Sequence, residues 1–223
     1  VNLTLAAPLG PMPALAPLGK FPALGSIVRH ALLGTLDRRE IATEIGRQID
    51  AFAQATGFPP DFIDGHQHVH SLPGIRDACL EALAERFPGR GPLIRDPADR
   101  ALAILQRRAA VVKALVIASL AIGFGDRVRH AGFSTNHGFS GVSPFTPGTS
   151  FESELAAFFA APGRRHLVMC HPGHPDDALR RLDAVVERRA QELAALMRMP
   201  GLPEAIWHVE RRPGIDYPVW PGS

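Results

Sequence analysis

A short apolar strand and the histidine-rich loop after it decide the fold of this chain: Phe62-Ile63-Asp64-Gly65-His66-Gln67-His68-Val69-His70. Parallel sheets collect functional side chains just past the carboxyl ends of their strands. Asp64, His66, His68 and His70 follow such an end at a spacing of two, and carboxylate and imidazole are ligands that divalent ions accept. The stretch therefore predicts a divalent-metal site at the mouth of an α/β domain.

The rest of the chain alternates short apolar strands with helices. The expected strands cover residues 1–5, 62–64, 92–94 and 167–170, and the expected helices cover 37–56, 72–87, 98–122, 151–161 and 176–199. Asp37 should cap its helix, with Glu40 completing a capping box. This order favours a mainly parallel sheet, open or barrel-like, in a single domain over 1–223. Residues 200–223 are predicted to form an irregular tail.

A second motif, Met169-Cys170-His171-Pro172-Gly173, ends the last strand. His171 lies at the strand end, and its ordinary pKa near neutrality suits general acid or base chemistry. A turn histidine without a role is the alternative. We expect Cys170 to be a small buried hydrophobe and not a nucleophile. Arg95 ends another strand, where it could hold a substrate oxygen or form a surface ion pair with Asp96.

The histidine-rich loop also has a less specific interpretation, a polar and partly buried loop whose imidazoles are hydrogen-bonded or solvated. His66 is the best candidate for a metal ligand, and His70 is the second. His68 is assigned with Arg95 to substrate binding, and Asp64 to catalysis.

Composition narrows the function classes. The net charge of +2 over 223 residues does not suggest a nucleic-acid partner, and the most apolar segment is too short and too interrupted by charge to span a membrane. Two cysteines make no disulfide framework, which favours a reducing, cytoplasmic location. A homodimer is possible.

Together, the motif at 64–70, Arg95 and the motif at 169–173 resemble the YdjC-like carbohydrate deacetylases. The Asn-His-Gly-Phe-Ser-Gly stretch at 136–141 is closer to the branch associated with hopanoid biosynthesis. The resemblance implies a (β/α) barrel-like fold related to the TIM barrel, and hydrolysis of the acetyl group from an N-acetylated sugar. It also implies a divalent ion, Mg²⁺ or Zn²⁺, held by one Asp and two His, of which one falls on His66. A carboxylate would take the proton of the attacking water, and His171 would protonate the leaving amine.

The same resemblance places the family's other metal histidine immediately before Val1, and an Asp-Asp strand further upstream. We therefore expect a chain truncated at its N-terminus, lacking the first strand or strands of the barrel, with impaired activity. Two alternatives stay open: a mononuclear metal-dependent phosphoesterase or amidohydrolase, and a degenerate sugar-binding domain without catalysis. Binuclear amidohydrolases often need a carboxylated lysine on a late strand, and the positions of Lys20 and Lys113 count against that class.

Overall fold

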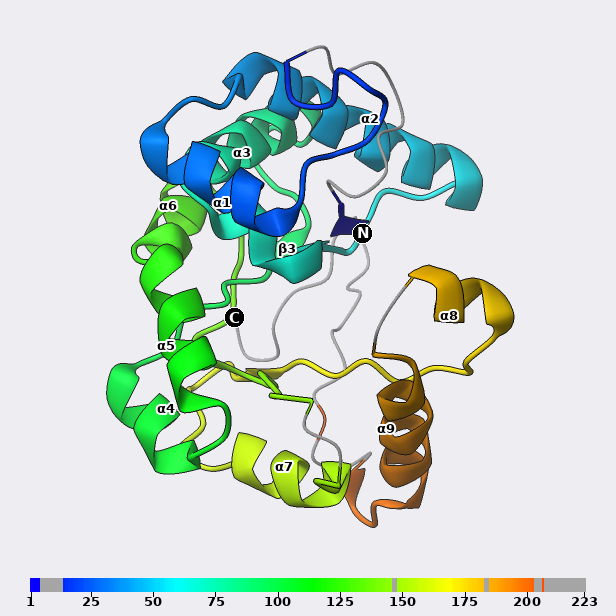
Figure 1. The fold of residues 1–223 in the computed structure, drawn as a ribbon. Coiled ribbons are helices and arrows are strands. Elements are labelled where there is room, and N and C mark those ends of the chain that lie inside the picture. The colour runs from blue at the N-terminus through cyan, green and yellow to red at the C-terminus, as the bar shows by residue number, and fades with distance from the viewer. Residues whose placement is uncertain (5–13, 146–147, 183–184, 203–205, 207–223) are drawn as a thin grey trace. The chain divides into compact units, whose positions relative to one another are not determined.

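A computed structural model of the chain describes residues 1–4, 14–145, 148–182, 185–202 and 206. These residues divide into two compact units (Figure 1). The first unit contains Val1–Ala98 and Ser119–Asn136, and the second contains Asp99–Ala118 and the described residues from His137 onward. Most of the predicted tail at 200–223 lies outside the described residues.

The sheet of the first unit has three parallel strands in the order β1 (Asn2–Leu3), β2 (Phe62–Gly65) and β3 (Leu93–Ile94). Ile63 pairs with Ile94 in the register, and a further parallel bridge joins Ile94 to Thr135. The carboxyl ends of β2 and β3 therefore lie at one edge, beside the segment that contains Thr135. The strand predictions at 62–64 and 92–94 are confirmed.

Five helical elements complete the first unit: α1 (Leu24–Leu33), α2 (Arg38–Thr56), the 3₁₀ segment η1 (His66–Ser71), α3 (Ile75–Arg86) and α6 (Phe124–His130). Asp37 caps α2 through the Glu40 N–H at 3.0 Å, as predicted. The carboxylate of Glu40 does not complete a capping box, because it accepts the N–H groups of Ala14 and Leu15, at 3.1 Å each. Sequence analysis missed α1.

The core of the first unit forms where α2 and α3 pack together (Figure 1). Ile41, Ile45 and Ile49 recur on one face of α2, where the helical period places them together, and all three are buried. Cys79 is also fully buried in α3, and burial raises the pKa of its thiol to about 12. This core holds β2 in place beneath the histidine-rich loop.

The second unit contains α4 (Ala101–Arg107), α5 (Val111–Leu120, all but its last two residues), β4 (Phe139–Ser140), α7 (Phe151–Phe158), β5 (Leu167–Val168), α8 (Asp177–Leu182) and α9 (Val186–Arg198). β4 and β5 pair in parallel. A smaller core joins α7 to α9 through Phe151, Leu155, Phe158 and Ala195. The predicted helix at 151–161 and the predicted strand at 167–170 are confirmed, although β5 is only half-buried.

Two helix predictions were wrong in length. The expected helix over 98–122 is broken, because Arg108 and Ala110 take left-handed φ angles of 55° and 42° between α4 and α5. At this point the guanidinium of Arg107 forms a buried ion pair with Asp99, 2.7 Å away. No local sequence pattern indicates this pair. The expected helix over 176–199 is likewise divided into α8 and α9.

The architecture is a mixed α/β fold with parallel strands, as predicted. Among the described residues the strands form one three-stranded and one two-stranded sheet, and no closed barrel is seen. No helix in this part of the chain is long and apolar enough to cross a membrane.

Candidate functional site

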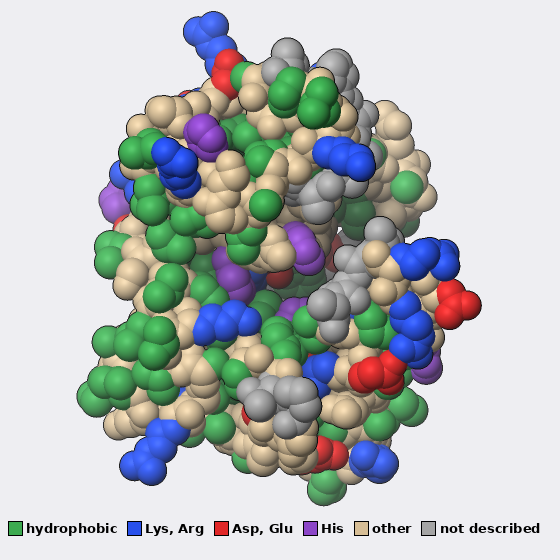
Figure 2. All heavy atoms as spheres, viewed as in Figure 1, with side chains coloured by type: hydrophobic (Ala, Val, Ile, Leu, Met, Phe, Trp, Pro, Cys, Tyr) green, Lys and Arg blue, Asp and Glu red, His purple; other side chains and the backbone are tan. Residues whose placement is uncertain are grey.

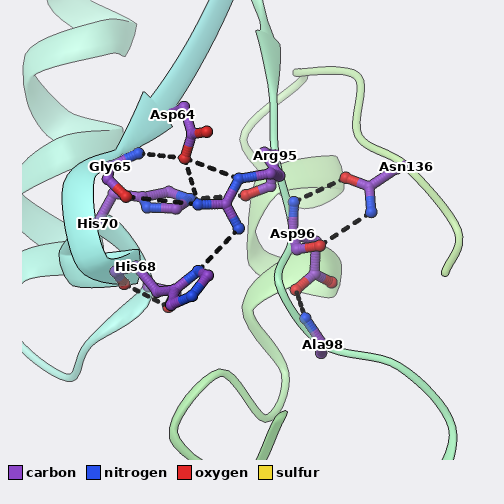
Figure 3. A network of polar contacts seen from close by, with 9 residues as sticks. Asp64, Gly65, His68, His70, Arg95, Asp96, Ala98 and Asn136 are labelled. Carbon is purple, nitrogen blue, oxygen red and sulfur yellow. Dashed lines mark hydrogen bonds and ion pairs between the residues drawn. The ribbon is translucent and has the colours of Figure 1, made fainter. Parts of the chain in front are cut away.

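The candidate site begins at the carboxyl end of β2, where the chain leaves the sheet and turns sharply. Gln67 and His68 both adopt the left-handed conformation, with φ angles of 54° and 63°. Each such residue costs on the order of 1–3 kcal/mol when it is not glycine, and this strain clusters at functional sites. The turn brings the imidazole of His68 next to Arg95, which follows β3 (Figure 3).

The guanidinium of Arg95 ties the ends of the two strands together. Its Nε donates to Oδ1 of Asp64 at 2.7 Å, a terminal nitrogen donates to the same oxygen, and the other terminal nitrogen lies 3.1 Å from Nδ1 of His68 (Figure 3). Arg95 is 3% exposed. The ion pair that sequence analysis considered with Asp96 therefore forms with Asp64 instead, and it is buried on the arginine side.

This ion pair controls the charge of Asp64. Burial raises the pKa of the carboxyl, but the hydrogen bonds and charge of Arg95 outweigh burial, so the pKa of Asp64 lies below its ordinary value. Asp64 is therefore ionised at neutral pH. A carboxylate held in this way is better suited to act as a fixed negative charge than as a base that must take up a proton.

His70 points inward, and its Nε2 lies 2.7 Å from the carbonyl oxygen of Arg95. A carbonyl only accepts, so Nε2 carries the hydrogen and Nδ1 carries the lone pair. Burial, followed by the charge of Arg95, lowers the pKa of His70 to about 4, so the ring is neutral at pH 7. Nδ1 lies against Gly65, since a Cβ added there would stand 2.3 Å from it. Glycine is needed at position 65 to admit the ring.

A divalent ion at this edge would need free ligand atoms on the nearby side chains. A metal could reach His70 only through Nδ1, which is buried against Gly65. Asp64 is already bound by Arg95, whereas His66 is exposed. Within the described ranges, no three His, Cys, Asp or Glu side chains gather where they could hold a metal ion. These residues alone therefore do not make a metal centre, and the arrangement favours a bracing role for His70.

Two polar residues that were named from the sequence, but not assigned to the site, complete the edge of the sheet. The backbone N–H of Asp96 donates to Oδ1 of Asn136, and Nδ2 of Asn136 donates to the Asp96 carbonyl, both at 2.8 Å (Figure 3). Burial raises the pKa of the Asp96 carboxyl to about 6, although Ala98 N–H donates to it. The position of Asp96, directly after a strand-end arginine, was the signal that could have identified it.

His171 belongs to the second unit and follows β5, as predicted. Its backbone N–H donates to the carboxylate of Glu192 in α9, and its ring meets that of Phe145 edge-on, with centroids 5.8 Å apart. Burial, helped by the negative charge of Glu192, raises the pKa of the neighbouring Cys170 thiol to about 11. A thiol that stays protonated at neutral pH is a poor nucleophile, as expected for Cys170.

The structure thus brings Asp64, His68, His70 and Arg95 together and leaves His66 exposed beside them. Three curated relatives are named carbohydrate deacetylase. The chain is 31% identical to the one from Mus musculus over 146 residues, which is 61% of this chain and 46% of the relative. It is 46% and 37% identical to those from Xenopus laevis and Danio rerio over 46 residues each, 21% of this chain and 15% of each relative.

The chain therefore spans less than half the length of the curated relatives it matches. The family model of YdjC-like proteins matches residues 1–200, which include all the residues of the candidate site. Because this match covers most of the chain, the chain belongs to the YdjC-like protein family.

Proposed function

We propose that this chain acts as a carbohydrate deacetylase, which hydrolyses the acetamide group of an N-acetylated sugar. The observation that carries the proposal is the network of Asp64, Arg95 and His68 at the carboxyl ends of adjacent parallel strands. Such edges are where parallel α/β folds place their active sites. The family match and the names of the relatives supply the reaction.

In the proposed reaction, water adds to the acetamide carbonyl carbon and gives up a proton to the solvent, the C–N bond breaks, and acetate and a free amine leave. Asp64 would present a fixed negative charge, because Arg95 keeps it ionised. His68, oriented by Arg95, would bind the sugar. His171 would give the leaving nitrogen its proton, acting as a general acid.

We also propose Mg²⁺ or Zn²⁺ as the cofactor, with the exposed imidazole of His66 as one ligand. Since the described residues do not supply three ligands, no step of the reaction above is assigned to the ion. Titration calorimetry of each ion into the protein and into His66→Ala measures the affinity for the ion and the contribution of His66 to it. Loss of ion binding in the variant supports the assignment, and unchanged binding contradicts it.

The deciding experiment measures acetate release from an N-acetylated chito-oligosaccharide, with a generic phosphodiester assayed in parallel. We expect acetate release that falls at least about 100-fold in His171→Ala, since general acid catalysis contributes 10²–10⁴-fold. His30→Ala is the control, because His30 is exposed and its ring pairs with the hydroxyl of Thr35, away from the candidate site residues. Phosphodiester cleavage without acetate release would favour the phosphoesterase alternative. Sugar binding without either activity would favour a sugar-binding domain.

Three finer proposals use the same preparation. A preference for an N-acetylated sugar carried by a hopanoid lipid would support the hopanoid-associated branch, and the rate itself tests the predicted impairment.

A homodimer is supported by exposed apolar side chains over α4 and α5 (Figure 2): Leu102, Leu105, Val112 and Val116 are 52–77% exposed. Light scattering of the protein and of Val112→Asp would detect the dimer and its loss.

A further inference from the structure

The motif that carries His171 is fastened to α9 by a buried charge. Glu192 lies on α9 with only 2% of its surface exposed, and its carboxylate accepts the backbone N–H of His171. Two residues further along the motif, the N–H of Gly173 donates to the carbonyl of Arg189 at 3.2 Å, also in α9. Pro172, between them, has no N–H. Both backbone donors of the His-Pro-Gly turn are thus used by one helix.

Glu192 is itself held by a buried ionic cluster. Arg188, one helical turn earlier, has its Nε 3.5 Å from the Glu192 carboxylate and donates to Glu154 of α7 at 2.5 Å. Another nitrogen of Arg188 donates to the Thr149 carbonyl at 2.8 Å. The side chains of Arg188 and Glu154 are 8% and 7% exposed. The guanidinium of Arg188 thus lies beside the Glu192 carboxylate at the turn.

A buried ionic cluster is not by itself evidence of stabilisation. Moving charges out of water costs several kcal/mol per ion, and replacing buried ion pairs with apolar residues is often neutral or stabilising. Two carboxylates share one guanidinium here, so the cluster keeps a negative charge next to the backbone N–H of His171. A backbone N–H bonded to a charged group is fixed more strongly than one bonded to a neutral group.

From these contacts we infer that Glu192 is the positioning residue of His171: its buried carboxylate, braced by Arg188, fixes the strand-end histidine in the orientation that catalysis uses. The inference rests on the proposed function for the role of His171, and on the geometry alone for the hold of Glu192. Groups that hydrogen-bond to metal-ligating side chains typically change activity 10–100-fold when they are removed, and we expect an effect of the same order here.

The test compares Glu192→Ala with Glu192→Gln, which keeps an oxygen acceptor of nearly the same shape. Glu187→Gln is the matched control, because Glu187 lies on the same helix and is 72% exposed. Amide hydrogen exchange at His171, measured by NMR, should accelerate at least about tenfold in Glu192→Ala, with most protection retained in Glu192→Gln and no change in the control. Circular dichroism establishes that each variant is folded.

Activity on the N-acetylated chito-oligosaccharide gives the second measurement. We expect kcat to fall about 10–100-fold in Glu192→Ala with KM within about twofold, and to be largely rescued in Glu192→Gln. Unchanged exchange at His171 in Glu192→Ala would overturn the inference, and so would faster exchange with unchanged kcat. If the unmodified protein releases no acetate, the proposed function fails, while the exchange measurement still decides whether Glu192 holds His171.

Discussion

Replacing Arg95 with methionine should loosen the edge of the sheet that carries the candidate site. The substitution keeps an unbranched chain of similar length but removes the guanidinium contacts of Arg95 to Asp64 and His68. Breaking a buried ion pair from one side costs about 3–5 kcal/mol, because the other charge stays behind unpaired. The Asp64 side chain is 34% exposed and can regain water, so we expect the lower end of that range, about 3 kcal/mol.

A local measurement suits a chain that divides into two units. Hydrogen exchange with mass spectrometry should be followed on peptides covering residues 62–72 and 90–98. A loss of 3 kcal/mol corresponds to exchange about 100-fold faster in these peptides. Arg38→Met is the matched control: Arg38 pairs with Glu81 in the same unit, but both side chains are half-exposed, so the expected loss is below about 1 kcal/mol.

The effect of Arg95→Met should also depend on pH. Because the folded pKa of Asp64 is lowered, its ion pair stabilises the protein above the unfolded pKa of about 3.9 and is lost as the pH falls through the folded value. The difference in melting temperature between protein and variant should therefore be full at pH 7 and shrink below about pH 4. Equal exchange rates in Arg95→Met and Arg38→Met at pH 7 would refute the reasoning.

Two further predictions concern the same edge. Gly65→Ala should destabilise the protein by about 1–3 kcal/mol in urea unfolding, because the new Cβ would stand 2.3 Å from Nδ1 of His70. The control is Gly25→Ala, which should be neutral or slightly stabilising because Gly25 is helical and has open space around it. Asp96→Asn should flatten the dependence of melting temperature on pH between about 4 and 6. With a folded pKa of about 6, Asp96 holds a proton that the unfolded chain has lost, so stability falls as pH rises through this window. The same slope in protein and variant would contradict the assignment.

Local patterns predicted the parts of this fold that depend on local physics. Asp37 caps α2 because a carboxylate satisfies the free N–H groups of a helix start wherever it occurs there. The convergence of Asp64 with Arg95 followed from parallel strands, whose carboxyl ends meet at one edge. Buried polar contacts away from the strand ends were not predictable, because no local pattern in the sequence indicates which distant residue will be the partner.

Glu192 and Gln67 show the two kinds of failure. An amphipathic pattern assigns a helical glutamate to solvent, so only the tertiary structure shows that Glu192 is buried against His171. Gln67 and His68 take a left-handed conformation that sequence analysis expects of glycine or asparagine, and the Arg95 contact accompanies this strain. Glu192 adjoins His171 in the second unit, and Gln67 adjoins the Asp64–Arg95 pair in the first. Local preference and global structure disagree most often beside residues of this functional kind.

In both units, polar groups that follow a parallel strand bond to a buried charged residue. A chain that leaves a parallel strand loses its ladder partners, and its polar groups must find others. After β3, the backbone carbonyl of Arg95 accepts Nε2 of His70 while its guanidinium holds Asp64. After β5, the carboxylate of Glu192 accepts the N–H of His171. In each unit a buried charged residue anchors a histidine motif, so substitution of the anchor should disturb the histidine that it contacts.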